Sequence, residues 1–121
     1  MYEIVFYKSK NIKSEIEDYL MELSCKKDKD SKIKFNKITC YIDLLEKYGT
    51  TMGEPYVKHL EGEIWELRPL RDRILFAYWD NNKFVLLNIF KKRTQKTPQM
   101  EIEKAKRYLK DFLKRSGENG Q

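Results

Sequence analysis

The spacing of hydrophobic residues divides the chain into a helical first half and a sheet-forming second half. Residues 2–7 alternate their side chains in a β-branched and aromatic context, which predicts a strand. Apolar residues then follow helical spacing over 12–23 and again over 35–48, with a charged loop at 26–32 between them. We expect two helices that pair antiparallel, the second ending where Gly49 follows Tyr48.

From residue 56 the hydrophobic period changes to two, as in half-buried strands. Strands are predicted over residues 56–60, 63–68, 73–79 and 84–90. Thr97 as N-cap and Pro98 at the first helical position open a last helix, which a frayed tail over 116–121 follows. The order β-α-α-β-β-β-β-α predicts one α+β domain over 1–121, in which helices cover an antiparallel sheet.

The net charge of +6 is unevenly distributed along the chain. Residues 1–54 hold ten lysines and ten acids, whereas residues 55–98 hold nine basic and five acidic residues. Within 91–98 there are four cations and no anion. Clustering of this kind indicates a polyanionic partner such as nucleic acid, although a solvated charged run is the simpler alternative.

The predicted hairpins decide which of these cations share a face of the sheet. A two-residue loop at Asn81-Asn82 would place Trp79 opposite Phe84 and Arg73 opposite Phe90. A two-residue loop at Pro69-Leu70 would place Arg68 opposite Arg71 and Glu66 opposite Arg73. One face would then carry Arg68, Arg71, Arg73, Lys92 and Glu66, with Lys91 on the other face beside Asp72. A slip of one residue would exchange Lys91 for Lys92.

A face with several cations and one carboxylate is costly to bury, so we expect it to be open to solvent. Arginines on it could bind phosphate oxygens and stabilise the charge that builds on phosphorus during transfer. The alternative is a cross-strand ion pair in which Glu66 and Arg73 only satisfy each other.

Other chemistries find little support in the sequence. His59 is the single histidine, which excludes a two-histidine ribonuclease, and no P-loop, GxGxxG, HExxH or GxSxG motif occurs. Glu66 is the one acid on the basic face, so we expect no metal and no cofactor. Cys25 and Cys40 lack metal-ligand spacing, which predicts free, at least partly buried thiols in a reducing cytosol. No apolar run has the length of a membrane span, and the first residues lack signal-peptide features.

The segment 60–98 resembles the RelE superfamily of bacterial toxins, most closely its phage-derived HigB-like branch. The resemblance rests on a W-E-L-R strand, an R-x-L strand, and an F-K-K-x-x-x-K-T-P stretch, and it extends over nearly the whole chain. It implies a RelE-like fold and the toxin of a type II toxin–antitoxin system, an endoribonuclease that cleaves messenger RNA on the ribosome in the cytoplasm. It also implies neutralisation by a cognate helix-turn-helix antitoxin of the HigA kind.

The resemblance assigns roles to particular residues. Arg73 matches the arginine that grips the scissile phosphate, Arg68 matches the arginine ending the preceding strand, and Lys92, with Lys91 as its competitor, matches the basic residue after the last strand. RelE itself has two lysines where this chain has Ile64 and Glu66, so we expect Glu66, or Glu54, to be the general base. The remaining predicted RNA contacts are Lys58, His59, Arg71, Arg93, Lys96 and Thr97.

The expected reaction is attack of the ribose 2′-hydroxyl on the adjacent phosphate, with Lys92 as the acid whose pKa the neighbouring arginines lower. Two alternatives remain open. A toxin on the same scaffold could poison DNA gyrase, although gyrase poisons generally lack this cationic set. A non-catalytic module could use the basic face only to bind nucleic acid, with salt-dependent affinity and no cleavage.

Overall fold

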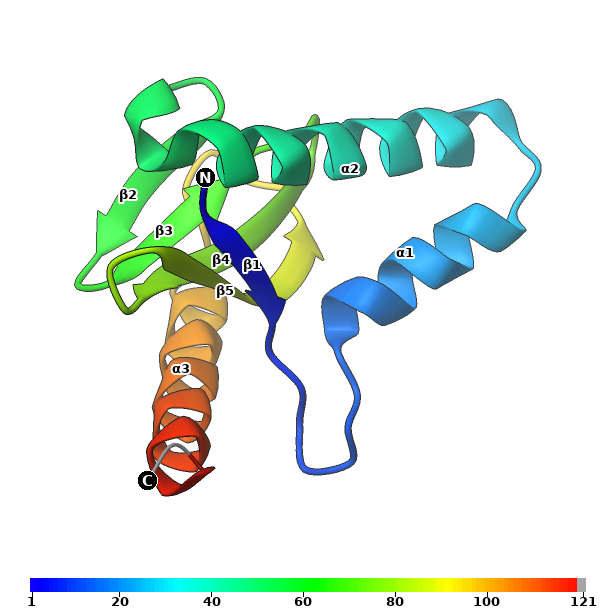
Figure 1. Ribbon diagram of the computed structural model, residues 1–121. Helices are drawn as coiled ribbons and strands as arrows, with labels where there is room; N and C mark the ends of the chain where they lie inside the picture. The colour runs from blue at the N-terminus through cyan, green and yellow to red at the C-terminus, as the bar shows by residue number, and fades with distance from the viewer. Residues whose placement is uncertain (120–121) are drawn as a thin grey trace.

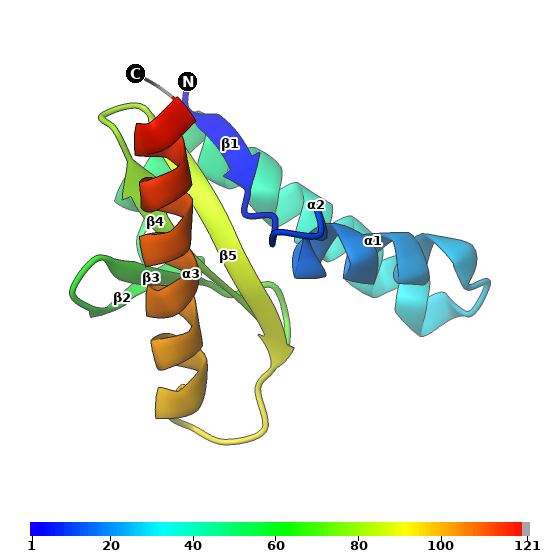
Figure 2. The same cartoon turned by 90° about the horizontal axis from the view of Figure 1, so that it is seen from below.

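The computed structural model describes residues 1–119 and shows two helical layers around one sheet (Figures 1 and 2). The strands are β1 (Glu3–Phe6), β2 (Val57–Glu61), β3 (Ile64–Leu67), β4 (Asp72–Trp79) and β5 (Lys83–Lys91). The helices are α1 (Glu15–Cys25), α2 (Lys29–Tyr48), the short 3-10 turn η1 (Gly49–Met52) and α3 (Gln99–Asn119). The α+β class and the order of the strands and long helices agree with the prediction.

The five strands lie in the order β1-β5-β4-β3-β2. β2 to β5 form the predicted antiparallel meander, but β1 runs parallel to β5, so the sheet is mixed and the prediction of a wholly antiparallel sheet is wrong. A parallel neighbour needs a long connection, which the helical hairpin and the meander supply. Nothing in the pattern of β1 itself says which strand it joins.

Two side-chain caps set where α1 and α2 begin. Helix α1 begins three residues later than predicted, because the Ser14 hydroxyl accepts the Glu17 backbone N–H at 3.2 Å. Helix α2 begins inside the predicted charged loop, because the Asp28 carboxylate accepts the Ser31 N–H at 3.0 Å. In Figure 1 the two helices run back from one short loop and splay away from the sheet.

Helix α2 ends at Tyr48, as predicted. Gly49 follows it with φ +63°, and a Cβ at this position would lie 2.7 Å from the Tyr2 ring. No other residue type fits this backbone without moving the tyrosine.

The start of α3 differs from the prediction. The Pro98 carbonyl accepts the N–H groups of Glu101 and Ile102, at 3.0 and 3.3 Å, so Thr97 is not the N-cap. The helix also continues to Asn119 through most of the predicted frayed tail, whose last two residues, 120–121, lie outside the described residues.

The predicted pairing of β4 with β5 is wrong next to the turn and correct at the other end of the two strands. Asp80 adopts φ +66°, and Trp79 pairs with Lys83, not with Phe84 as predicted. A bulge between Leu75 and Phe76 then restores the predicted pairing of Arg73 with Phe90.

The hairpin between β3 and β4 has a longer turn than predicted, with Leu70 at φ +56°. Glu66 therefore pairs with Leu75, not with Arg73. The shift is two residues along β4, so every side chain keeps its predicted face.

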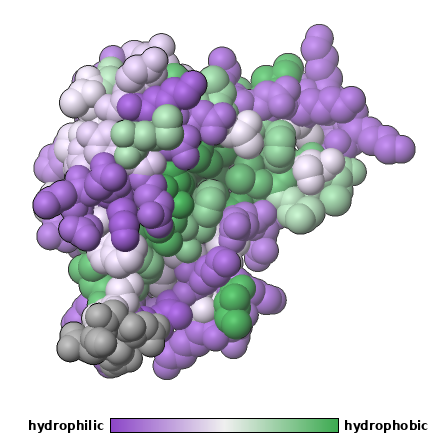
Figure 3. Space-filling model, viewed as in Figure 1, coloured by the Kyte–Doolittle hydropathy of each residue, from purple (hydrophilic) through white to green (hydrophobic). Residues whose placement is uncertain are grey.

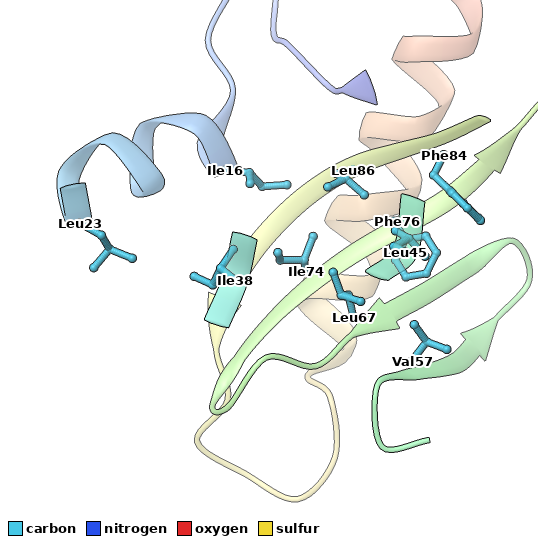
Figure 4. Packing of buried hydrophobic residues seen from close by; sticks show 10 residues of the cluster. All are labelled: Ile16, Leu23, Ile38, Leu45, Val57, Leu67, Ile74, Phe76, Phe84 and Leu86. Carbon is cyan, nitrogen blue, oxygen red and sulfur yellow. The ribbon is translucent and has the colours of Figure 1, made fainter. Parts of the chain in front are cut away.

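Each face of the sheet has its own hydrophobic cluster. Figure 4 shows the cluster under α1 and α2, to which β4 contributes Ile74 and Phe76. The second cluster lies under α3 and includes Leu75 and Ala77 from the same strand. In Figure 3 apolar side chains gather between the sheet and the helical hairpin, and polar side chains surround them. Within residues 1–119, no helix has the length and apolar character to cross a bilayer.

Candidate functional site

A buried ion pair joins β3 to β4 on the face covered by α3. The Arg73 Nε lies 3.1 Å from the Glu66 Oε1, and the exposed fractions of the two residues are 8% and 1%. The prediction that this face is open to solvent is therefore wrong for both residues. Burial is tolerated because each charge has the other as its partner, whereas either alone would be strongly unfavourable.

The rest of the Arg73 guanidinium is held by the backbone. Its Nη1 donates hydrogen bonds to the carbonyls of Leu70 and Asp72, at 2.8 and 2.9 Å. Its Nε is buried and forms no hydrogen bond within the described part of the chain, although it lies within ion-pair distance of Glu66. Burial lowers the pKa of Arg73, an effect that the Glu66 carboxylate opposes. Arg73 is thus held by two backbone carbonyls and one carboxylate, and only a small part of its surface stays exposed.

The Glu66 carboxylate is also held from the other side. The Thr97 hydroxyl, from the segment before α3, lies 3.1 and 3.0 Å from its two oxygens and donates to them. Thr97 therefore bonds across to β3, while Pro98, whose carbonyl accepts the first helical N–H groups, stands where Thr97 was predicted to cap α3.

Lys92 lies just beyond β5, and its backbone N–H donates to the Arg71 carbonyl at 2.8 Å. Its side chain is half-buried and forms no ion pair with any described residue. Burial lowers the pKa of Lys92, and the nearby cation of Arg73 lowers it further. An amine in this setting releases its proton more readily than an exposed lysine does.

Arg68 lies beside this group, at the end of β3. Its Nη1 lies 3.2 Å from the Oε1 of Glu54, an exposed residue whose side chain keeps 66% of its surface accessible. The Arg68 backbone N–H donates to the Tyr56 carbonyl at 2.9 Å, and the Tyr56 ring packs on Tyr41. The sequence analysis assigned no site role to either tyrosine.

Two hollows open on the surface around Arg73, Glu66 and Lys92. The first, of about 310 Å³, is lined by six of the predicted site residues: Lys58, His59, Glu66, Lys92, Lys96 and Thr97. The second, of about 700 Å³, is lined by Arg71, Arg73, Lys91 and Arg93. Lys92 and Gln95 line both hollows. All the predicted site residues except Arg68 and Glu54 therefore lie in these walls. Gln95 and Gln99 were missed because neutral amides carry no distinctive sequence signal.

This surface is basic because its acidic side chains form ion pairs, whereas most of its cationic side chains do not. Glu66 pairs with Arg73, Glu54 with Arg68, and Glu61 with Lys106. Among the described residues no acid lies within ion-pair distance of the side chains of Lys58, Arg71, Lys91, Lys92, Arg93 or Lys96. Six unpaired cations around two hollows form an anion-binding surface.

The reverse face of the sheet holds a second buried acid, Asp72, which is 3% exposed and pairs in register with Lys91. Its carboxylate lies 3.5 Å from the Tyr19 hydroxyl, and the two residues line a cavity of about 80 Å³. Burial raises the pKa of Asp72, although Lys34 and Lys91 oppose this effect.

Asp72 should make the stability of the fold depend on pH. Because its pKa is higher in the fold than in the unfolded chain, its stabilising contribution is complete at low pH and is lost as the pH rises through the folded value. We expect Asp72→Asn to gain stability relative to the wild type as the pH is raised from about 4 to about 7. Urea unfolding at both values measures this, and an equal difference at the two would contradict it.

Two further predictions concern cysteines and metals. Cys25 and Cys40 are free, as predicted, but both are exposed, so the prediction of partial burial is wrong. They lie on the solvent sides of α1 and α2, outside the apolar stripes of these helices.

Within residues 1–119, no three His, Cys, Asp or Glu side chains gather closely enough to hold a metal ion.

Residues 28–110 match the family model described as Phage derived protein Gp49-like (DUF891). This range includes α2, the meander from β2 to β5, and both hollows. No curated protein matches the chain.

Proposed function

Because the chain belongs to the Gp49-like family of phage-derived, RelE-like and toxin-like proteins, we propose that it is the toxin of a type II toxin–antitoxin system. We propose further that it is an endoribonuclease of the HigB kind, which cleaves messenger RNA on the ribosome in the cytoplasm. One observation carries the nuclease proposal: Arg73 lines the same hollow as Lys92, which forms no ion pair with any described residue.

The proposed reaction is an exchange of two phosphate ester bonds. The ribose 2′-oxygen bonds to phosphorus as the bond from phosphorus to the 5′-oxygen breaks, which leaves a 2′,3′-cyclic phosphate and a 5′-hydroxyl. Charge builds on the phosphate oxygens, to which the guanidinium of Arg73, in the wall of the hollow, donates. Leu70, Asp72 and Glu66 hold the arginine in place before RNA binds, so its side chain needs little rearrangement during the reaction.

Two groups move the protons. Lys92 donates a proton to the departing 5′-oxygen. Of the two carboxylates expected as the base, Glu66 is buried and occupied by Arg73 and Thr97, whereas Glu54 is exposed beside Arg68. We assign the uptake of the 2′-hydroxyl proton to Glu54 and the orientation of Arg73 to Glu66.

Replacing Lys92 with arginine tests whether the site needs a positive charge at this position or a proton donor. Arginine keeps the cation but holds its proton too tightly to donate it, so we expect kcat to fall about 10²-fold with KM nearly unchanged. Wild-type activity should decline at alkaline pH, below the ordinary lysine value of 10.5, as Lys92 loses its proton. The variant should lack that decline, and an identical pH profile in both proteins would remove Lys92 from the acid role.

A partner is part of the proposal. An unpaired cationic surface with nuclease activity must be restrained in the host, and the family implies a cognate antitoxin. We propose a helix-turn-helix antitoxin of the HigA kind, with messenger RNA and the ribosome as the other partners.

Inducible expression in bacteria, with primer extension on a translated messenger, tests the proposal. We expect growth arrest and new cuts at codon spacing. Arrest without cuts would indicate another target, such as DNA gyrase, and binding of RNA without arrest or cuts would indicate a non-catalytic module.

A further inference from the structure

The segment from Lys92 to Pro98, called here the cationic loop, joins β5 to α3. It carries three cations without ion pairs among the described residues, Lys92, Arg93 and Lys96. These side chains, with Gln95, form much of the wall of both hollows.

The loop is attached to the sheet at its two ends. At the start, the Lys92 backbone N–H donates to the Arg71 carbonyl at 2.8 Å. At the other end, the Thr97 hydroxyl donates to Glu66, with distances of 3.1 and 3.0 Å to the two oxygens. Between them, the Thr94 hydroxyl bonds only within the loop, to the Lys96 carbonyl.

Thr97 is therefore the one residue of the loop whose side chain hydrogen-bonds to the sheet, within the part of the chain that the structure describes. The acceptor is the same carboxylate that pairs with Arg73. The cationic loop and Arg73 thus share one buried partner, Glu66.

We propose that Thr97 is a positioning residue, whose hydroxyl fastens the cationic loop to Glu66 and so holds Lys92 and Lys96 in place for the RNA backbone. The inference rests on the proposed function, whose substrate it describes further. The phosphates on either side of the scissile one would lie in the two hollows, which meet at Lys92 and Gln95. Without the anchor, the loop would have to be ordered each time RNA binds, at a cost in affinity.

This role differs from the direct RNA contact that the sequence predicted for Thr97. The hydrogen of its hydroxyl is already donated to Glu66, and the residue is half-buried. Thr97 would then affect RNA binding indirectly, because it holds Lys92 and Lys96 in position.

Thr97→Val and Thr97→Ser test the proposal. Valine keeps the shape of threonine and removes the hydroxyl, whereas serine keeps the hydroxyl. Binding is measured with single-stranded RNA that carries 2′-deoxy positions, which cannot be cleaved. We expect Thr97→Val to weaken binding about tenfold, as loss of a hydrogen bond to a charged group would, and Thr97→Ser to bind nearly as the wild type.

A matched control and a second readout separate positioning from general destabilisation. Thr39→Val makes the same exchange in α2, where the hydroxyl bonds to the Phe35 carbonyl, and should leave RNA binding unchanged. Trypsin cuts after lysine and arginine, so brief digestion under native conditions should cut the loop of Thr97→Val faster than that of the wild type or Thr97→Ser.

Equal RNA binding by Thr97→Val and the wild type, or failure of serine to restore it, would overturn the inference. So would equal rates of tryptic cutting in the loop. Because the RNA is uncleavable and the digestion needs no RNA, these results are independent of the proposed nuclease activity. A wild-type protein that cuts no messenger would refute the proposed function and leave the anchoring of the loop to be judged by digestion.

Discussion

Replacing Arg73 with lysine should reduce RNA cleavage about 10²- to 10³-fold while the protein remains folded. Lysine keeps a positive charge opposite Glu66, so the buried carboxylate is not left alone. Its ammonium group cannot, however, bond to the Leu70 and Asp72 carbonyls and also offer phosphate the several N–H donors of a planar guanidinium.

Cleavage of a translated messenger under single-turnover conditions measures this effect. Arg107→Lys, the same exchange at an exposed position on α3, serves as the control and should cleave at the wild-type rate. A folded Arg73→Lys protein with near-wild-type activity would show that the cationic charge alone, and not the guanidinium geometry, supports the reaction.

Replacing Glu66 with alanine should destabilise the fold by about 3–5 kcal/mol, because it leaves the Arg73 charge buried without its partner. The variant also frees the Thr97 hydroxyl, so the loss includes the hydrogen bond that anchors the loop. Urea unfolding followed by far-UV circular dichroism gives the free energy of unfolding.

Glu54→Ala is the control for this effect. Its carboxylate forms an ion pair of nearly the same length, 3.2 Å with Arg68, but at an exposed position where solvent screens the charges. We expect little change in stability. A loss for Glu66→Ala no larger than for Glu54→Ala would mean that the buried pair does not stabilise the fold.

Local sequence patterns predicted the elements of the fold because each helix and strand has one apolar face. Where the spacing of apolar residues changed to a period of two, the predicted strand bounds lie within one or two residues of those observed. The parallel pairing of β1 with β5 depends on a contact between distant segments, for which the sequence has no local signal.

The sequence predicted that the candidate site residues share one face of the sheet, but it did not predict that two of them are buried. The alternation of side chains predicted that Arg73, Glu66 and Lys92 share one face of the sheet. They do so in the structure, although both hairpin turns differ from the assumed ones. Burial of the ion pair could not be predicted, because it depends on how the segment before α3 crosses that face. The Thr97 hydrogen bond shows this, since a residue that reads locally as a helix cap bonds across 31 positions to β3.

The chemistry of the RNA ends tests the central claim most directly. Purified protein is added to ribosomes translating a defined messenger, and the new 5′ ends are labelled with polynucleotide kinase without prior phosphatase treatment. The proposed transesterification predicts ends that accept the label at once, paired with 2′,3′-cyclic phosphates, in the wild type and not in Arg73→Lys. New ends that require phosphatase before labelling, or equal cutting by the variant, would contradict a mechanism in which Arg73 stabilises attack by the 2′-hydroxyl.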